Sequence, residues 1–426
     1  MKIGLAFNGG GAALAVALSL FNPAALAQTD RFVATTGSNA GNTCLNAATP
    51  CASVGHAISQ ANAGDRVRVA AGTYTESLTI DRDIEISGVG SNETIIQAAA
   101  SPGAVVQRVI FVNSGRQLLL RHLTVRHGFA DGSSSISRRG GGIYLDGGDL
   151  ELEDVILTAN RARSDGGAIY NSSGTVTVLN SDVRSNWGCQ IGGSCGNGGA
   201  INNAGGAVIL INTLLRGNEA GRGGAIYTGG AGNSLSLTNV ALTGNLAGNF
   251  GGAIGNVAGQ LELTNVVFSA NRAIGEGGGL YSQSSGAAPV IRNSIFWNNQ
   301  DNSGVGTTTA SIFNSALTST TVSHSLMQGC GGSGGGWNAD CGADLGGNLV
   351  PQNPGFTEAI SPGSAPNSNG YFRQGTASPV INRGNNAYIA GVSTDLDGWA
   401  RIIDGVVDLG PYEFGNDGLF RDRFEQ

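Results

Sequence analysis

The sequence GGGIY at residues 140–144 returns five more times along the middle of the chain. The later copies are GGAIY at 166–170, GGAIN at 198–202, GGAIY at 223–227, GGAIG at 251–255 and GGGLY at 277–281. Successive copies begin 26, 32, 25, 28 and 26 residues apart. A nearly constant period in this range predicts a repeat architecture, in which each unit buries its apolar face by stacking on its neighbours.

Each repeat also holds a segment of alternating apolar and polar residues, such as VTVLN at 176–180 and LELTN at 261–265. This period of two predicts short strands, and the repeat leaves no room for a helix. We therefore predict an all-β fold, a parallel β-helix of about ten coils. The residues that end these segments are expected to form a hydrogen-bonded column at a turn, as asparagine ladders do. They are Asp154, Asn180, Asn212, Asn239, Asn265 and Asn293.

The glycine phrases, together with phrases such as FSAN at 268–271, resemble the repeats of polymorphic outer membrane proteins. The resemblance covers residues 140 to about 299. It implies the right-handed parallel β-helix that pectate lyases also use, and the expected handedness rests on it alone. It does not imply a function, because this fold carries lyases, hydrolases, adhesins and spacers.

The beginning of the chain has the features of a secretory signal, which we assign to residues 1–27. Lys2 is followed by an apolar stretch, and Ala25-Leu26-Ala27 fits a cleavage site. Residues 28–64 are predicted to form an N-terminal cap with a helix that ends at Gly64. The apolar face of this helix would use Val54, Ala57, Ile58 and Ala61. The β-helix is then assigned to residues 65–328.

After residue 328 the repeats stop and the composition changes. SPVINRG at 378–384, TDLDG at 394–398 and VDLGPYE at 407–413 resemble the choice-of-anchor Q region of exported bacterial β-helices. Asn382 and Pro411 depart from that pattern. We assign residues 329–414 to this region, expect it to close the far end of the solenoid, and assign 415–426 to a polar tail.

The six cysteines form three close pairs, Cys44/Cys51, Cys189/Cys195 and Cys330/Cys341. An even number of cysteines behind a signal peptide predicts local disulfides. A zinc site is the alternative. It would need further ligands, and only His56 lies near a pair.

The composition of the chain limits the partners and the location that we expect for the protein. The net charge is −7 and charged residues make up 12% of the chain, so nucleic acid is not an expected partner. No later apolar run is long enough to span a membrane. We expect a secreted protein, extracellular or associated with the outer membrane or cell surface of a Gram-negative-type bacterium. It is expected to be a monomer without a cofactor, and surface glycans or polysaccharides are its possible partners.

A column of tyrosines is the candidate carbohydrate site. Each tyrosine follows an aliphatic residue that should point inward, so its ring should point outward. Exposed tyrosine rings can hold the apolar faces of sugars, whereas rings beneath loops would shield the backbone. The candidates are Tyr144, Tyr170, Tyr227 and Tyr281.

The sequence offers no catalytic constellation. The acids are scattered between coils, the histidines are expected to be structural, and Asp395 and Asp397 lack the glutamate spacing of a calcium loop. No metal site is therefore predicted. The leading expectation is a structural or adhesive protein that presents loops and a long face. The alternatives are a polysaccharide lyase or hydrolase and a non-catalytic carbohydrate-binding module.

Overall fold

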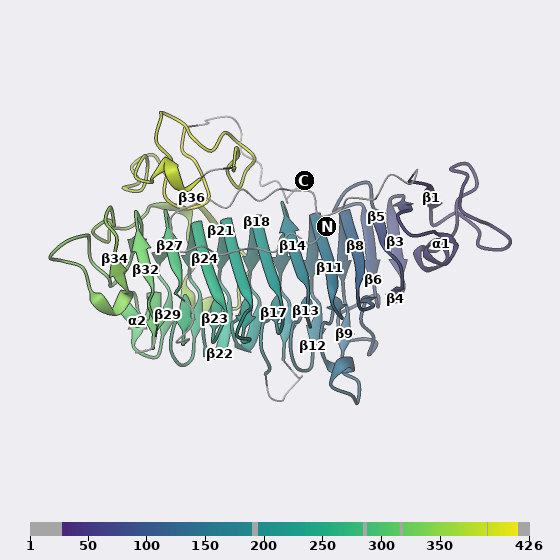
Figure 1. Cartoon of the computed structure of the whole chain (residues 1–426), viewed down its shortest axis with the longest axis horizontal. Helices are drawn as coiled ribbons and strands as arrows, with labels where there is room; N and C mark the ends of the chain where they lie inside the picture. Colours follow the sequence, from purple (N-terminus) through teal and green to yellow (C-terminus); the bar gives the residue numbers. More distant parts are fainter. Residues whose placement is uncertain (1–27, 190–194, 284–287, 316–317, 390, 416–426) are drawn as a thin grey trace.

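The computed structural model describes residues 28–189, 195–283, 288–315, 318–389 and 391–415. The predicted signal peptide and all of the predicted tail except Gly415 lie outside these residues. The described chain winds into a right-handed parallel β-helix of about nine turns, which Figure 1 shows from the side. The fold class predicted from the repeats is confirmed.

Three sheets form the walls. The largest has 17 strands. They are β1 (Asp30–Val33), β2 (Arg66–Val69), β3 (Gly72–Thr75), β5 (Ile84–Ser87), β6 (Thr94–Gln97), β8 (Arg116–Arg126), β11 (Gly148–Thr158), β14 (Thr175–Leu179), β15 (Asp182–Arg184), β18 (Ala207–Arg216), β21 (Ser234–Thr243), β24 (Gln260–Ser269), β27 (Val290–Arg292), β28 (Ile295–Trp297), β32 (Thr321–Ser323), β33 (Leu326–Met327) and β34 (Ala343–Asp344).

The other two walls have nine and eight strands. The nine are β4 (Leu78–Ile80), β7 (Ile110–Val112), β10 (Ile143–Leu145), β13 (Ile169–Asn171), β17 (Ile201–Asn203), β20 (Ile226–Thr228), β23 (Ile254–Asn256), β26 (Leu280–Ser282) and β31 (Ile312–Asn314). The eight are β9 (Phe129–Ala130), β12 (Arg161–Ala162), β16 (Trp187–Gly188), β19 (Glu219–Arg222), β22 (Leu246–Phe250), β25 (Arg272–Ala273), β29 (Gln300–Asp301) and β30 (Gly304–Val305).

The glycine phrases sit where the chain turns into the nine-stranded wall. Gly166 has a φ of 66°, a left-handed conformation that glycine adopts without a penalty. A Cβ on Gly167 would lie 2.2 Å from the carbonyl oxygen of Gly199 in the next turn. The two glycines thus serve different needs, a backbone conformation and a close approach between turns.

The register follows the repeat. Ile143 pairs with Ile169, Ile169 pairs with Ile201, and the stack continues to Leu280. A second stack in the largest sheet runs from Leu152 to Ile291. Both stacks are buried and form the core, as predicted.

The predicted asparagine column is also present. Asn180 and Asn212 each have a φ of 49°, a conformation that asparagine tolerates better than most side chains. Nδ2 of Asn212 donates to Oδ1 of Asn180 at 3.3 Å, and Nδ2 of Asn239 donates to Oδ1 of Asn212 at 3.1 Å. We call the residues at this position the turn column; His122 occupies it one turn before Asp154.

A second asparagine ladder lies inside the solenoid, and we call it the inner ladder. Each Nδ2 donates to Oδ1 of the next member at 2.9–3.2 Å, and every member is buried. The members are Asn160, Asn186, Asn218, Asn245, Asn271 and Asn299. Buried amides are costly unless they are paired, so this ladder fixes the register of the turns.

The N-terminal end is covered by α1 (Val54–Gln60), which buries Val54, Ala57 and Ile58. The carboxylate of Glu76 accepts the N–H groups of Val54 and Gly55, both at 2.8 Å. An anion at this position offsets the positive end of the helix. The helix ends at Gln60, four residues before the expected Gly64, because the cap residue Ala61 is already extended.

The C-terminal end of the solenoid differs from the prediction that residues 329–414 would close it. It is closed by residues up to about 349, where β34 adds to the wall and Trp337 packs against the core. The short helical segments are α2 (Thr308–Ser311), η1 (Ile136–Arg138), η2 (Ala339–Cys341), η3 (Pro362–Ser364) and η4 (Asn386–Tyr388). Residues 353–414, with the hairpin β35 (Phe356–Glu358) and β36 (Tyr371–Gln374), do not extend the end. They lie on the side of the solenoid, above β21 to β27 in Figure 1, and we call them the lateral lobe.

The lateral lobe is held by a second hydrophobic core outside the solenoid. Five outward residues of consecutive turns contribute one side of it: Leu214, Ala241, Val267, Ile295 and Leu326. The lobe contributes Phe372, Val380, Leu396, Leu409 and Tyr412. The expected end cap is therefore mostly a lateral lobe, because these turns carry an apolar column on their outer face.

Candidate functional site

An open groove of about 550 Å³ lies on the wall of the solenoid beside β8 and β11. We call it the wall groove. Its described lining residues are Gly90, Ser91, Asn92, Glu93, His122, Glu153, Asp154 and Asn180. The first four belong to the turn between β5 and β6, and the last four belong to or flank the turn column. The groove therefore has one wall from a connecting turn and one from the stacked turns.

A histidine–carboxylate pair lies in the wall groove. Nδ1 of His122 is 2.8 Å from Oδ2 of Asp154, and their side chains are 46% and 33% exposed. An ionised carboxylate can only accept, so Nδ1 carries the proton. In the neutral imidazole Nε2 is then an acceptor, and the described residues provide no hydrogen bond to it. The pair can accept a hydrogen bond or a proton from a ligand in the groove.

The charge of the wall groove is negative. Its described lining residues include Glu93, Glu153 and Asp154 but neither lysine nor arginine. Arg121, next to the groove, pairs with Glu153 at 2.9 Å and offsets part of this charge. The groove thus presents mainly hydrogen-bond acceptors.

The wall groove continues the surface on which the lateral lobe docks. Oδ1 of Asn293 accepts the backbone N–H of Asn385 at 2.9 Å, and its Nδ2 donates to the carbonyl of Asn385 at 3.1 Å. Nδ2 of Asn239 donates to the carbonyl of Thr394 at 2.7 Å. The turn column is covered by the lobe at these turns and lines an open groove at His122, Asp154 and Asn180.

The lobe reaches the column through a buried arginine. Arg401 pairs with Glu413, and its Nε lies 3.2 Å from the amide of Asn265, whose oxygen faces the guanidinium. Burial raises the pKa of Glu413 to about 8 although Arg401 opposes the shift, and burial also lowers the pKa of Arg401. These groups are interior parts of the docked lobe.

The aspartates considered for a calcium loop are also structural. Oδ1 of Asp395 accepts the N–H groups of Asp397 and Trp399 at 3.0 and 2.8 Å, and Oδ2 accepts that of Glu413 at 3.0 Å. Asp397 pairs with Arg373 at 2.7 Å. Burial raises the pKa of Asp395 to about 6. The carboxylates hold the fold of the lobe.

The predicted tyrosine column is stacked but largely covered. The rings of Tyr144 and Tyr170 are 5.1 Å apart, and both side chains lie outside the main core. The expectation of exposed rings was wrong for Tyr144, Tyr170 and Tyr281, which are 3%, 6% and 8% exposed. Tyr227 is half-buried.

Tyr144 and Tyr170 are covered by arginines from neighbouring turns. The guanidinium carbons of Arg108 and Arg139 lie 4.9 Å from the ring centres of Tyr144 and Tyr170. Arg108 also donates to the carbonyl oxygens of Ile136 and Arg139, which fixes the loop above the column. The loops therefore shield these rings, as in the alternative considered for them.

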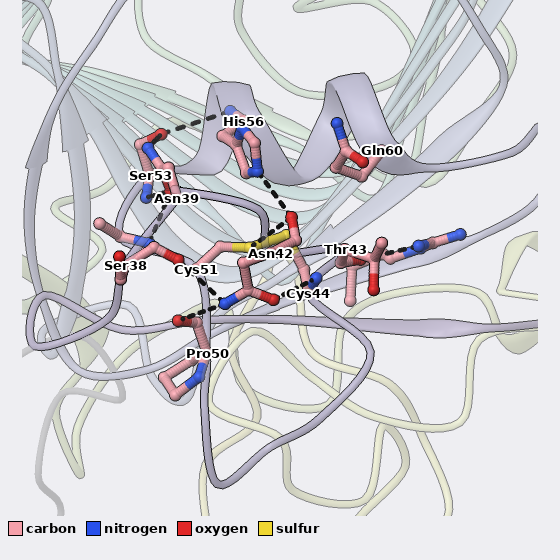
Figure 2. The surroundings of a disulfide bond; sticks show 12 residues. Ser38, Asn39, Asn42, Thr43, Cys44, Pro50, Cys51, Ser53, His56 and Gln60 are labelled. Carbon is pink, nitrogen blue, oxygen red and sulfur yellow. Dashed lines mark hydrogen bonds between the residues drawn. A yellow bond between two sulfur atoms is a disulfide. The ribbon is translucent and has the colours of Figure 1, made fainter.

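All three predicted disulfides are present: Cys44–Cys51, Cys189–Cys195 and Cys330–Cys341. Figure 2 shows the first one beside α1, where Nε2 of His56 lies 2.8 Å from the carbonyl oxygen of Asn42. Two groups of potential metal ligands occur among the described residues, Cys44/Cys51/His56 and Cys189/Cys195/Glu219. Both depend on sulfur atoms that are already bonded to each other. The structure thus favours disulfides over the zinc alternative.

The wall groove was missed by the sequence reasoning. The available signal was a break in the turn column, where asparagine gives way to histidine and aspartate in adjacent turns. Local departures from a repeat mark positions where function is added. Nothing in the sequence indicated that the turn at residues 90–93 would line the groove.

Comparison with known proteins identifies the fold and no family. No family model matches the chain, and no curated protein matches it. Among solved structures, pectate lyase Pel9A aligns with a TM-score of 0.55 and 16% identity over 91% of this chain and 97% of its own. A rhamnogalacturonan lyase gives 0.46 and 14% over 82% and 97%, and a pectin methylesterase from carrot gives 0.40 and 12% over 74% and 88%. At these identities the likeness to Pel9A establishes the β-helix fold alone.

No helix in the described part of the chain is long and apolar enough to cross a membrane.

Proposed function

We propose that the protein is an exported β-helix scaffold that binds glycans in the wall groove. The observation that supports this most is the groove itself, an open space of about 550 Å³ whose lining offers imidazole and carboxylate groups. Sugars carry many hydroxyl groups, and such ligands are held by several placed hydrogen-bonding groups. The stacked turns beneath the groove keep these groups in fixed positions.

The fold is compatible with this function. Pel9A is named as a pectate lyase, so the same architecture serves a protein that acts on a polysaccharide. That likeness gives the glycan proposal a precedent and does not supply the ligand. Export, a cell-surface or outer-membrane location and an adhesive role remain parts of the proposal that rest on the sequence. The same holds for the resemblances to polymorphic outer membrane proteins and the choice-of-anchor Q region.

The pairing of His122 with Asp154 supports a second candidate, a polysaccharide-active enzyme. A carboxylate that fixes an imidazole tautomer leaves the other nitrogen available as a general base. Cleavage would then depend on His122. Binding without cleavage would require only its hydrogen-bonding capacity.

Sugar binding by the tyrosine column remains a prediction. It would require Arg108, Arg139 and the loop at residues 130–139 to move from the rings that they now cover. The wall groove needs no such movement, which is why we prefer it as the binding site.

The test is to incubate the purified chain with a panel of glycans and to score retention and cleavage separately. His122→Asn and Asp154→Asn are suitable variants because asparagine occupies the same turn position in neighbouring turns. Both should keep the fold and reduce retention, while Glu358→Gln, an exposed change in the lobe, should not. Retention of no glycan, or equal retention by all variants, would overturn the proposal. Cleavage that His122→Asn abolishes would establish the enzyme instead.

A further inference from the structure

A column of small buried residues in the eight-stranded wall ends in an aspartate. Ala220 pairs with Ala247, Ala247 pairs with Ala273, and all three are at most 1% exposed. Strand β29 extends this register by one turn, so Asp301 takes the position that alanine has in the turns before it. Asp301 is 4% exposed. A buried charge at a position that neighbouring turns give to alanine is a local departure from the repeat, which marks where function is added.

One oxygen of the Asp301 carboxylate has hydrogen-bond partners and the other has none. Oδ1 accepts the backbone N–H of Ser303 at 2.9 Å and the hydroxyl of the same residue at 2.5 Å. Oδ2 is buried without a hydrogen-bond partner, and Asp301 forms no ion pair within the described part of the chain. A buried charged oxygen without a donor or a counterion is unfavourable. Oδ2 is therefore an acceptor that is available to a ligand.

Three hydroxyl groups gather beside this carboxylate. Oγ of Ser303 lies 2.6 Å from Oγ1 of Thr307 and 2.8 Å from Oγ1 of Thr309. Oγ1 of Thr307 also accepts the backbone N–H of Ala310 at 3.1 Å. Because the Ser303 hydroxyl donates to Asp301, both threonine hydroxyls can donate to Ser303, which leaves lone pairs free on the threonine oxygens. The group thus offers neutral oxygen ligands next to one carboxylate.

A hard metal cation matches this arrangement. Such ions take carboxylate and neutral oxygen ligands, and a bound cation neutralises a buried carboxylate. A calcium ion approaches its oxygen ligands to about 2.3–2.6 Å, closer than the distance of about 2.8 Å at which a water hydrogen-bonds. An ion therefore suits an oxygen as closely packed as Oδ2 of Asp301 better than a water does.

We propose that Asp301, Ser303, Thr307 and Thr309 form a binding site for a hard cation, either calcium or sodium. The Asp301 carboxylate supplies the charge through Oδ2, and the hydroxyl groups supply neutral ligands. The site joins the turn between β29 and β30 to α2, which lies beside β29 (Figure 1). The ion thereby fastens one of the last turns of the solenoid. This site is separate from the wall groove and does not depend on glycan binding.

Calorimetry on the chelator-treated chain tests the site directly. With a single carboxylate, calcium should bind with a dissociation constant on the order of 10⁻⁴–10⁻³ M. Asp301→Ala should abolish this binding and keep the fold, because alanine occupies the same position in the preceding turns. Asp301→Asn, which keeps the size of the side chain, should lose the binding as well. Asp340→Ala, an exposed aspartate of η2, is the matched control and should bind calcium like the unmodified chain.

Thermal unfolding separates an ion site from a purely structural aspartate. In chelator with choline chloride, Asp301→Ala should unfold at the same temperature as the unmodified chain or above it, since an unpaired buried oxygen is removed. In about 10 mM calcium the unmodified chain should gain about 1–3 °C, and the variant should gain nothing. A gain in sodium chloride over choline chloride at equal ionic strength, without a gain in calcium, would identify the ion as sodium.

Three outcomes would overturn the inference. One is the absence of calcium and sodium binding, and another is equal binding by the unmodified chain and Asp301→Ala. The third is an equal loss of stability of Asp301→Ala with and without the ions, which would show that Asp301 only fixes the turn through Ser303.

Discussion

Arg401 and Glu413 form an ion pair inside the lateral lobe, with side chains that are 1% and 0% exposed. The guanidinium also donates to the carbonyl oxygens of Asp408 and Gly410. One side chain thereby joins two parts of the lobe and reaches the amide of Asn265 on the solenoid. The docking of the lobe depends on this arginine more than on any exposed charge, because a buried charge without its partner is strongly destabilising.

Arg401→Met is expected to loosen the lateral lobe and leave the solenoid folded. Removal of one partner of a buried pair costs about 3–5 kcal/mol. Trypsin cleavage after Arg373, which is 5% exposed in the docked lobe, should become rapid. Arg383→Ala, at an exposed position, is the control and should leave the cleavage rate unchanged. Equal protection of Arg373 in both variants would show that the pair does not hold the lobe.

The stability of the lobe should fall as the pH rises. The pKa of Asp395 is raised to about 6, chiefly by burial. A raised carboxyl pKa means that the folded state binds the proton more tightly. Its contribution is complete below the unfolded pKa and is lost as the pH rises through the folded one. Urea unfolding of the lobe between about pH 4 and 7 should show decreasing stability.

Asp395→Asn provides the control for this pH dependence, because asparagine does not titrate. Its stability curve should be flatter between about pH 4 and 7 than that of the unmodified chain. A lobe whose stability rises over this range, or whose slope Asp395→Asn leaves unchanged, would contradict the assignment.

Asn218→Ala should destabilise the solenoid more than substitution of an exposed asparagine. Its Nδ2 donates to Oδ1 of Asn245 and to the carbonyl of Val183, and its Oδ1 accepts from Asn186. Buried groups left unpaired cost about 1–3 kcal/mol each, so a loss of at least about 2 kcal/mol is expected in urea unfolding. Asn249→Ala, an exposed position, should change stability by less than about 0.5 kcal/mol.

The disulfides should differ in their contribution to stability. Cys330 and Cys341 are fully buried at the closed end of the solenoid, whereas Cys195 is exposed. Replacement of Cys330 and Cys341 by serine should cost about 2–4 kcal/mol, since it frees a chain segment that packs on the core. Replacement of Cys189 and Cys195 should cost less. Thermal unfolding of the two double variants checks the order, which an equal fall in melting temperature would refute.

Much of the fold could be predicted because, in a solenoid, residues that are one repeat apart in the sequence contact each other in neighbouring turns. The stack from Ile143 to Leu280 and the turn column followed from spacing alone. The direction of the tyrosines also followed from alternation. Their burial did not, because it depends on Arg108 and Arg139, whose guanidinium groups cover rings on neighbouring positions of the stack.

The lateral lobe was harder to predict because its position depends on contacts between distant segments. A signal nevertheless existed in the outward column that begins at Leu214 and ends at Leu326. At the same position one turn earlier the residue is polar, since Asp182 is in register with Leu214 and pairs with Arg216 at 2.9 Å. The wall groove is formed by a change of residue type in the turn column together with a connecting turn from another coil. Only the change in the turn column is visible in the sequence, so the groove could not be predicted from it.

The inner ladder has a direction, since every amide from Asn160 to Asn271 donates toward the following member. Each turn supplies one donor and one acceptor, so a whole turn can be gained or lost without leaving an amide unpaired, whereas a fraction of a turn cannot. Asn180 of the wall groove and Asn212, whose Nδ2 donates to Oγ1 of Thr394 in the lateral lobe, lie in adjacent turns. Duplication of a single repeat between these two turns would therefore move the groove away from the lobe by one coil.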